Sequence, residues 1–162
     1  MVASLCETSG RTLHLVDLEN LIGDARAASS TALQVFERYL ALAEWRDGDL
    51  VYVATNPALA SRIVWDLRVP CHRATACGPD GADRALLNVV SPDFVARRVE
   101  RLVIGSGDHI FIQRALQVRE LGTGVAVVSR PASLHSGWRA HGFPVIQLGG
   151  HDDVATPARR AA

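Results

Sequence analysis

The sequence predicts an α/β domain, a three-layer α/β/α sandwich whose central, mostly parallel sheet has about five to six strands. Short apolar runs alternate with helical patterns along nearly the whole chain, as in parallel sheets whose strands are joined by crossing helices. The runs favour Val and Ile, which is typical of strands covered on both faces. A chain of 162 residues can bury an ordinary core for one such domain.

Six apolar runs are expected to form the strands. They span residues 11–16, 50–54, 69–73, 102–104, 125–128 and 145–148. Pro70 indicates that the third strand lies toward an edge of the sheet, because proline cannot donate to a neighbouring strand. Residues 17–24, after the first strand, are expected to form a loop.

The helices are recognised by apolar spacing and by capping residues. Leu33, Phe36 and Leu40 recur at helical spacing, and Ser91-Pro92-Asp93 combines a cap, a first-turn proline and a first-turn acid. The expected helices span residues 29–45, 57–67, 83–90, 92–100 and 109–119, with a short one from 133 past 138.

The domain is expected to cover residues 11–148, between a lead-in at 1–10 and a flexible tail at 149–162. No signal segment is evident, and no apolar run approaches the roughly 20 residues that span a bilayer, so no membrane is expected. The three cysteines fit no disulfide framework, which favours a reducing, cytoplasmic location. A formal net charge of zero argues against binding a polyanion by bulk charge.

Two of the expected strands deliver an aspartate at their carboxyl ends. Asp17 follows the first strand directly, and Asn20 comes one helical turn later; Asp108 follows the turn Gly105-Ser106-Gly107 after the fourth strand. Ligands of open parallel sheets bind at this edge, where the strand order reverses. If the first and fourth strands flank the reversal, Asp17 and Asp108 face each other.

Asp83, at the start of a helix, completes the candidate set of Asp17, Asn20, Asp83 and Asp108. Gathered carboxylates repel each other unless a cation lies among them, and such oxygen ligands suit Mg²⁺ or Mn²⁺. Either ion could support phosphodiester hydrolysis. Taken singly, the aspartates also read as helix caps, turn formers or dipole partners, and Asn20 as a turn residue.

Three blocks of sequence, at 16–21, 81–86 and 104–111, together resemble the NYN domain, a family of PIN-like ribonucleases. The resemblance covers roughly residues 11–148 and implies a PIN-like sandwich, Mg²⁺ or Mn²⁺, and RNA cleavage. By motif position, Asp17, Asp83 and Asp108 would be metal ligands. Asn20 would hold the geometry of the metal site or the bound phosphate, and Ser106 would support the turn or touch the substrate.

The chain departs from the family pattern at three positions. Ile110 stands where the family usually has a second Asp in the third block, Asp80 stands where Lys often begins the middle block, and Val89 replaces a later Asp. These departures reduce the charge available for a second ion. His109 is either a partial compensation, as ligand or proton carrier, or a first-turn helix residue at the rim.

RNA as a partner would require cations at the rim of the acidic site, and Arg84, Arg114 and Arg130 are placed to reach a phosphate. Single arginines of this kind are usually solvated surface residues. A denser group, at 97, 98 and 101, is expected at the opposite end of the sheet. The tryptophans at 45, 65 and 138 are expected in the core, and His14 is expected to be a satisfied buried histidine.

The sequence therefore predicts a metal-dependent endoribonuclease with an acidic site at the carboxyl edge of the sheet. A catalytically weakened NYN-type domain, acting as an RNA- or protein-binding regulatory module, is the alternative that Ile110 and Val89 favour. Besides RNA, a second copy of the chain or another protein is considered as a partner. A phosphohydrolase of small molecules, using the same carboxylates, is a third.

Overall fold

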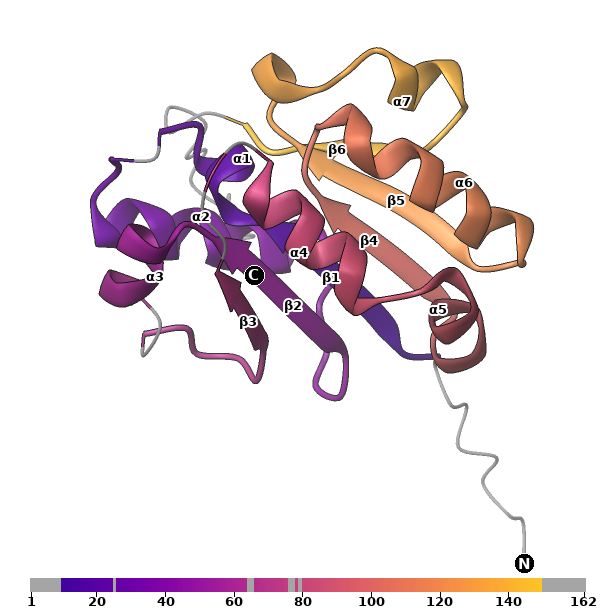
Figure 1. The fold of residues 1–162 in the computed structure, drawn as a ribbon, viewed down its shortest axis with the longest axis horizontal. Helices are drawn as coiled ribbons and strands as arrows, with labels where there is room; N and C mark the ends of the chain where they lie inside the picture. The colour runs from indigo at the N-terminus through magenta and orange to yellow at the C-terminus, as the bar shows by residue number, and fades with distance from the viewer. Residues whose placement is uncertain (1–9, 25, 64–65, 76–77, 79, 150–162) are drawn as a thin grey trace, which may run out of the picture.

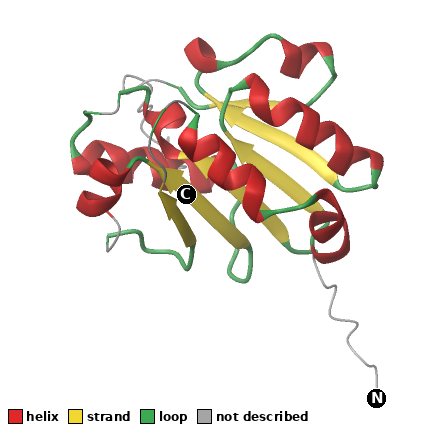
Figure 2. Cartoon of the chain, in the orientation of Figure 1, coloured by secondary structure: helices red, strands yellow, loops and turns green. Residues whose placement is uncertain are grey.

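The computed structural model describes residues 10–149 except 25, 64–65, 76–77 and 79. Six parallel strands form one sheet in the order β3-β2-β1-β4-β5-β6, with helices on both faces (Figures 1 and 2). The strands are β1 (Thr12–Asp17), β2 (Leu50–Thr55), β3 (His72–Thr75), β4 (Arg101–Gly105), β5 (Gly124–Ser129) and β6 (Val145–Gln147). The predicted α/β/α sandwich is confirmed, and its sheet is parallel throughout.

The helices follow the predicted order with shifted bounds. They are α1 (Leu18–Ile22), α2 (Ser29–Leu42), α3 (Pro57–Ile63), α4 (Gly81–Val89), α5 (Pro92–Arg98), α6 (Ile112–Glu120) and α7 (Gly137–Ala140), with two 3-10 turns, η1 (His109–Phe111) and η2 (Pro131–Ser133). The structure places β3 at the edge, as Pro70 indicated, but begins it at His72.

Two expectations for local structure are wrong. The segment after β1 is not a loop: Leu18 and Leu21 are fully buried, and their packing holds a one-turn helix that Gly23 ends with a φ of 77°. The short helix expected from 133 is divided, because η2 ends at Ser133 and α7 begins only at Gly137.

Alternating side chains of the strands fill two hydrophobic layers. Leu13 and Leu15 of β1 lie in one layer with Leu86 of α4, whereas Val16 lies in the other with Phe36 of α2. Alternation also gives Asp17 the same side of the sheet as Leu13 and Leu15, which is the side that α4 covers. Because Asp17 lies on this side of the sheet, its carboxyl group faces the block at 81–86, which forms the start of α4.

The strand order reverses between β1 and β4. From β1 the chain moves outward through β2 to β3, then returns to pair β4 with the free side of β1 and continues outward to β6. Val16 pairs with Gly105, so the segments that follow both strands leave the sheet at the same edge (Figure 1). A crevice for a ligand is expected at such a reversal.

The remaining sequence expectations have mixed outcomes. His14 is fully buried and satisfied, with Nδ1 3.1 Å from the Tyr39 hydroxyl and Nε2 3.5 Å from Asp49 Oδ2. Trp138 is fully buried, and Trp45 packs half-buried against the core, whereas residues 1–9, 65 and 150–162 lie outside the described part. In the described part, no helix has the length and apolar character to span a bilayer.

Candidate metal centre

Asp17 is positioned by the junction between β1 and α1. As the N-cap of α1, it accepts a hydrogen bond on Oδ1 from the backbone N–H of Asn20, at 3.2 Å. The residue is only 5% exposed. The capping role that the sequence offered as an alternative is therefore real, and it holds the carboxyl group at the end of β1.

Asn20 joins the two halves of the sheet across the reversal. Its side-chain oxygen accepts a hydrogen bond from Gly107 N, at 3.0 Å, in the turn that follows β4. Its backbone carbonyl accepts one from Arg130 Nε, at 3.2 Å, and Arg130 also donates to Ser133 Oγ, at 2.6 Å. Asn20 thus sets the distance between the segments that carry Asp17 and Asp108.

Asp108 is held by its own turn. Its backbone N–H donates to Ser106 Oγ, at 3.2 Å, and its Oδ1 accepts from Ile110 N, at 3.0 Å, while lying 3.0 Å from His109 Nδ1. Because Ser106 is fully buried, its geometry matches support of the turn rather than contact with a substrate. The carboxyl group of Asp108 is therefore held at its Oδ1 by the turn that follows β4.

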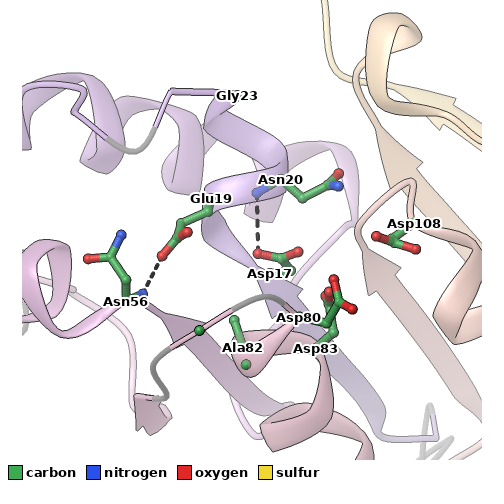
Figure 3. A pocket seen from close by; sticks show the side chains of 11 residues that line it. Asp17, Glu19, Asn20, Gly23, Asn56, Asp80, Ala82, Asp83 and Asp108 are labelled. Carbon is green, nitrogen blue, oxygen red and sulfur yellow. Dashed lines mark hydrogen bonds between the residues drawn. The ribbon is translucent and has the colours of Figure 1, made fainter.

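The N-terminal turn of α4 contributes two further carboxylates. Asp83 is 6% exposed, and Asp80, with a left-handed backbone at φ 54°, precedes the helix as its N-cap residue. Single carboxylate oxygens of Asp80, Asp83 and Asp108 lie within 4.8 Å of one another. In Figure 3 these three side chains point into one space, with Asp17 beside Asp83.

The electrostatics of this cluster favour the uptake of positive charge. Burial raises the pKa of Asp17 to about 8, and the neighbouring Asp83 carboxyl adds to the rise. Burial also raises the pKa of Asp83; its contact with Asp17 opposes the rise, and the charges of Asp108 and Asp80 reinforce it. Carboxyl groups with such raised pKa values are stabilised either by protons or by a cation.

The surroundings of one carboxylate oxygen indicate whether these residues fit a divalent ion. Asp83 Oδ1 is buried and has no hydrogen-bond partner in the structure, although an unsatisfied buried carboxylate oxygen is costly. Three oxygen donors from aspartates are the ligand chemistry of Mg²⁺ and Mn²⁺. The donor set therefore fits such an ion, with Asp80 in the group of three and Asp17 next to it.

The cluster opens into a pocket of about 370 Å³. Besides Asp17, Asn20 and the three clustered aspartates, its lining includes Glu19 and Asn56 (Figure 3). Glu19 Oε1 accepts hydrogen bonds from the backbone N–H of Asn56 and from Thr55 Oγ1, the latter at 3.2 Å. Glu19 therefore fastens the end of β2 to α1 and forms the wall of the pocket opposite Asp108.

Sequence reasoning missed Asp80 and Glu19 as members of this site. In the sequence, Asp80 stands out only as a departure from the family pattern, and its convergence with Asp108 depends on where the N-terminal turn of α4 lies relative to the turn after β4. Glu19 lies within the first block, directly before Asn20, and that position was the only signal available for it.

The arginines that the sequence analysis considered lie at different places relative to the pocket. Arg84 is exposed one residue after Asp83, and the Arg130 guanidinium approaches Gly23, a residue of the pocket lining. Arg114 instead donates to the carbonyl of Val90, just beyond the C-terminal end of α4, so its expected contact with a phosphate is not supported. Arg101 pairs with Glu44, at 3.2 Å, at the opposite end of the sheet, as expected.

Ile110 and Val89, the two departures that remove acids, have structural surroundings of their own. Ile110 is partly buried and packs against the core layer that contains Phe111. Val89 is 48% exposed in the last turn of α4, six residues beyond Asp83 and therefore about 9 Å farther along the helix. Neither position adds an oxygen to the cluster.

Comparisons with known proteins add no relatives: no family model, no curated protein and no solved structure matches the chain.

Proposed function

We propose that this protein is a metal-dependent endoribonuclease that holds Mg²⁺ or Mn²⁺ among Asp80, Asp83 and Asp108, with Asp17 adjoining. The observation that carries the proposal is the buried, unpartnered Oδ1 of Asp83 beside two other carboxylates. A hydrogen-bonded acidic cluster would need no ligand, whereas this one retains an unsatisfied oxygen.

The chemistry follows from the ion and from the residues that hold its ligands. When bound, a divalent ion offsets the charge that develops on a phosphodiester and activates water for attack. Asn20 and Ser106 keep the two aspartate-bearing turns at a fixed separation, as their hydrogen bonds to Gly107 and Asp108 indicate. Preorganised ligands of this kind lose little free energy to rearrangement when the substrate binds.

RNA as the substrate rests on two further supports. The three sequence blocks that resemble the NYN domain contribute Asp17, Asn20, Asp83 and Asp108, and all four line this one pocket. Arg84 and Arg130 add positive charge near its rim, where a backbone phosphate would approach.

A second function, binding RNA or a protein partner without cleavage, is favoured by Ile110. This side chain packs against the core where the family pattern has an acid, so this position supplies no charge for a second ion. The same fold and pocket would then serve a regulatory module.

The test follows a labelled structured RNA, such as a tRNA, with Mn²⁺, with Mg²⁺ and with a chelator. Wild type is compared with Asp108→Asn, and with Asp93→Asn as a control because Asp93 is exposed in the first turn of α5. The proposal predicts metal-dependent cleavage that Asp108→Asn abolishes and Asp93→Asn retains.

Other outcomes would separate the alternatives. RNA retention in a gel shift without cleavage would identify the binding module. Metal-dependent turnover of a generic aryl phosphate with no effect on RNA would identify a small-molecule phosphohydrolase. Equal cleavage by wild type and Asp108→Asn would contradict the proposed site.

A further inference from the structure

Asn56 lies in the same wall of the pocket as Glu19, on the side opposite Asp108 (Figure 3). It joins the end of β2 to the start of α3. Its backbone N–H donates to Glu19 Oε1, which fixes its position relative to α1, and its side chain is partly exposed. A ligand that fills the pocket would therefore lie beside the Asn56 side chain.

One hydrogen bond fixes the direction of the Asn56 amide. Its Oδ1 accepts from the backbone N–H of Leu59, at 2.8 Å, and so caps the first turn of α3. Because only the oxygen of the amide can accept from this N–H, the assignment of Oδ1 and Nδ2 is settled. In the part of the chain that the structure describes, no group accepts a hydrogen bond from Nδ2. Nδ2 is therefore a donor that a ligand can use.

The surroundings of this donor favour an uncharged acceptor. The charged side chains in the described lining of the pocket are all carboxylates. A phosphate at Asn56 would also lie beside the Glu19 carboxylate and would be repelled by it, whereas a neutral oxygen would not. The phosphate of a bound nucleotide is expected instead at the ion among Asp80, Asp83 and Asp108.

The size of the pocket suits one nucleotide rather than a duplex. Its volume of about 370 Å³ is close to the lower limit for sites that enclose small ligands, which is roughly 300 Å³. Unpaired nucleotides of RNA can be splayed out and recognised through hydrogen bonds to the edges of their bases. A base edge also offers the neutral acceptors that the Asn56 donor requires.

The cap on α3 limits which base Asn56 can recognise. Asparagine reads adenine with both ends of its amide, because Nδ2 donates to a ring nitrogen while Oδ1 accepts from the amino group. Oδ1 of Asn56 is engaged by Leu59 N, which leaves donation by Nδ2. A carbonyl oxygen of a base needs a donor alone, and uracil carries carbonyl oxygens whereas adenine carries none.

We propose that Asn56 is a specificity-determining residue, whose Nδ2 donates to a base carbonyl of an unpaired nucleotide in this pocket and thereby favours uridine over adenosine. This inference rests on the proposed function of the metal cluster, which would hold the phosphate of the same nucleotide.

The experiment compares labelled oligouridine and oligoadenosine of equal length. Single-turnover cleavage and, where the strands stay intact, affinity by fluorescence anisotropy are measured with Mn²⁺ for wild type, Asn56→Ser, Asn56→Asp and Asn88→Ser. Serine and aspartate both keep an oxygen that can cap α3, and urea unfolding verifies that these variants fold. Asn88→Ser is the matched control, because Asn88 is exposed on α4 and outside the described pocket lining.

The wild type should prefer oligouridine. In Asn56→Ser the ratio of the value for oligouridine to that for oligoadenosine should fall by about fivefold, the effect of one lost hydrogen bond. Asn56→Asp should lower the ratio further, because a carboxylate repels a carbonyl oxygen and accepts from the amino group of adenine. Asn88→Ser should leave the ratio unchanged. A role for Asn56 only as the cap of α3 would change both strands equally, and that result would overturn the inference.

The two proposals can fail separately. If neither strand is cleaved, the endoribonuclease proposal fails, and the ratio of the anisotropy affinities decides the role of Asn56. If the strands are cleaved but wild type, Asn56→Ser and Asn56→Asp show the same strand preference, only the inference about Asn56 fails. Absence of binding to either strand would contradict both.

Discussion

Replacing Asp17 by Asn should change how stability depends on pH. The pKa of Asp17 is raised from 3.8 to about 8 in the folded protein, chiefly by burial. Between these two values the folded protein binds a proton that the unfolded chain releases. The stabilisation from this proton is complete below pH 3.8 and is lost as the pH rises toward 8.

The size of this pH effect on the free energy of unfolding follows from the one proton that Asp17 retains in the folded protein. A difference of one bound proton changes the free energy of unfolding by about 1.4 kcal/mol per pH unit. Relative to Asp17→Asn, the wild type should therefore lose about 2.5 kcal/mol between pH 5.5 and 7.5 when no metal is present. Asp83, whose pKa is also raised, contributes with the same sign.

The assay is urea unfolding at several pH values in the presence of a chelator, with intrinsic fluorescence as the signal. Burial of His14 lowers its pKa, so His14 makes the protein more stable as the pH rises toward 6.5, the opposite sign. Subtracting the variant from the wild type removes this shared contribution. Parallel stability curves for the two proteins would refute the assignment of a retained proton to the Asp17–Asp83 pair.

Two further variants test the packing that positions the site. Asn20→Ala removes the acceptor for Gly107 N, so it should cost about 1–2 kcal/mol and weaken RNA cleavage; unaltered values for both would show that the tie is dispensable. Gly105→Ala would place a Cβ 2.7 Å from the Tyr39 ring and should cost about 1–3 kcal/mol by urea unfolding. Gly124→Ala, whose nearest neighbour would lie 3.5 Å away, should change stability by less than about 0.5 kcal/mol; equal effects of the two glycine variants would contradict this packing argument.

The fold was readable from the sequence because its strands are short, apolar and separated by helical patterns. The pairing of β1 with β4, on which the meeting of Asp17 and Asp108 depended, is confirmed. Helix α1 escaped prediction because five residues are too few for a stable isolated helix, and its stability comes from burying Leu18 and Leu21.

The sequence predicted only part of the candidate site. Asp17, Asp83 and Asp108 stood out because each follows or begins an element, whereas Asp80 enters the cluster through a left-handed backbone conformation that an ordinary sequence pattern does not announce. Asn56 could not be predicted, because its place in the pocket wall depends on how β2 ends beside α1. The use of RNA and of a metal ion stays a prediction.

The most direct test of the central claim is a Mn²⁺ titration followed by electron spin resonance of the free ion at neutral pH. The account predicts that the wild type and Asp93→Asn remove Mn²⁺ from solution, and that Asp83→Asn does not, because Asp83 supplies the buried, unpartnered oxygen of the cluster. Equal Mn²⁺ uptake by the wild type and Asp83→Asn, or no uptake by the wild type, would contradict the assignment of a metal centre to these aspartates.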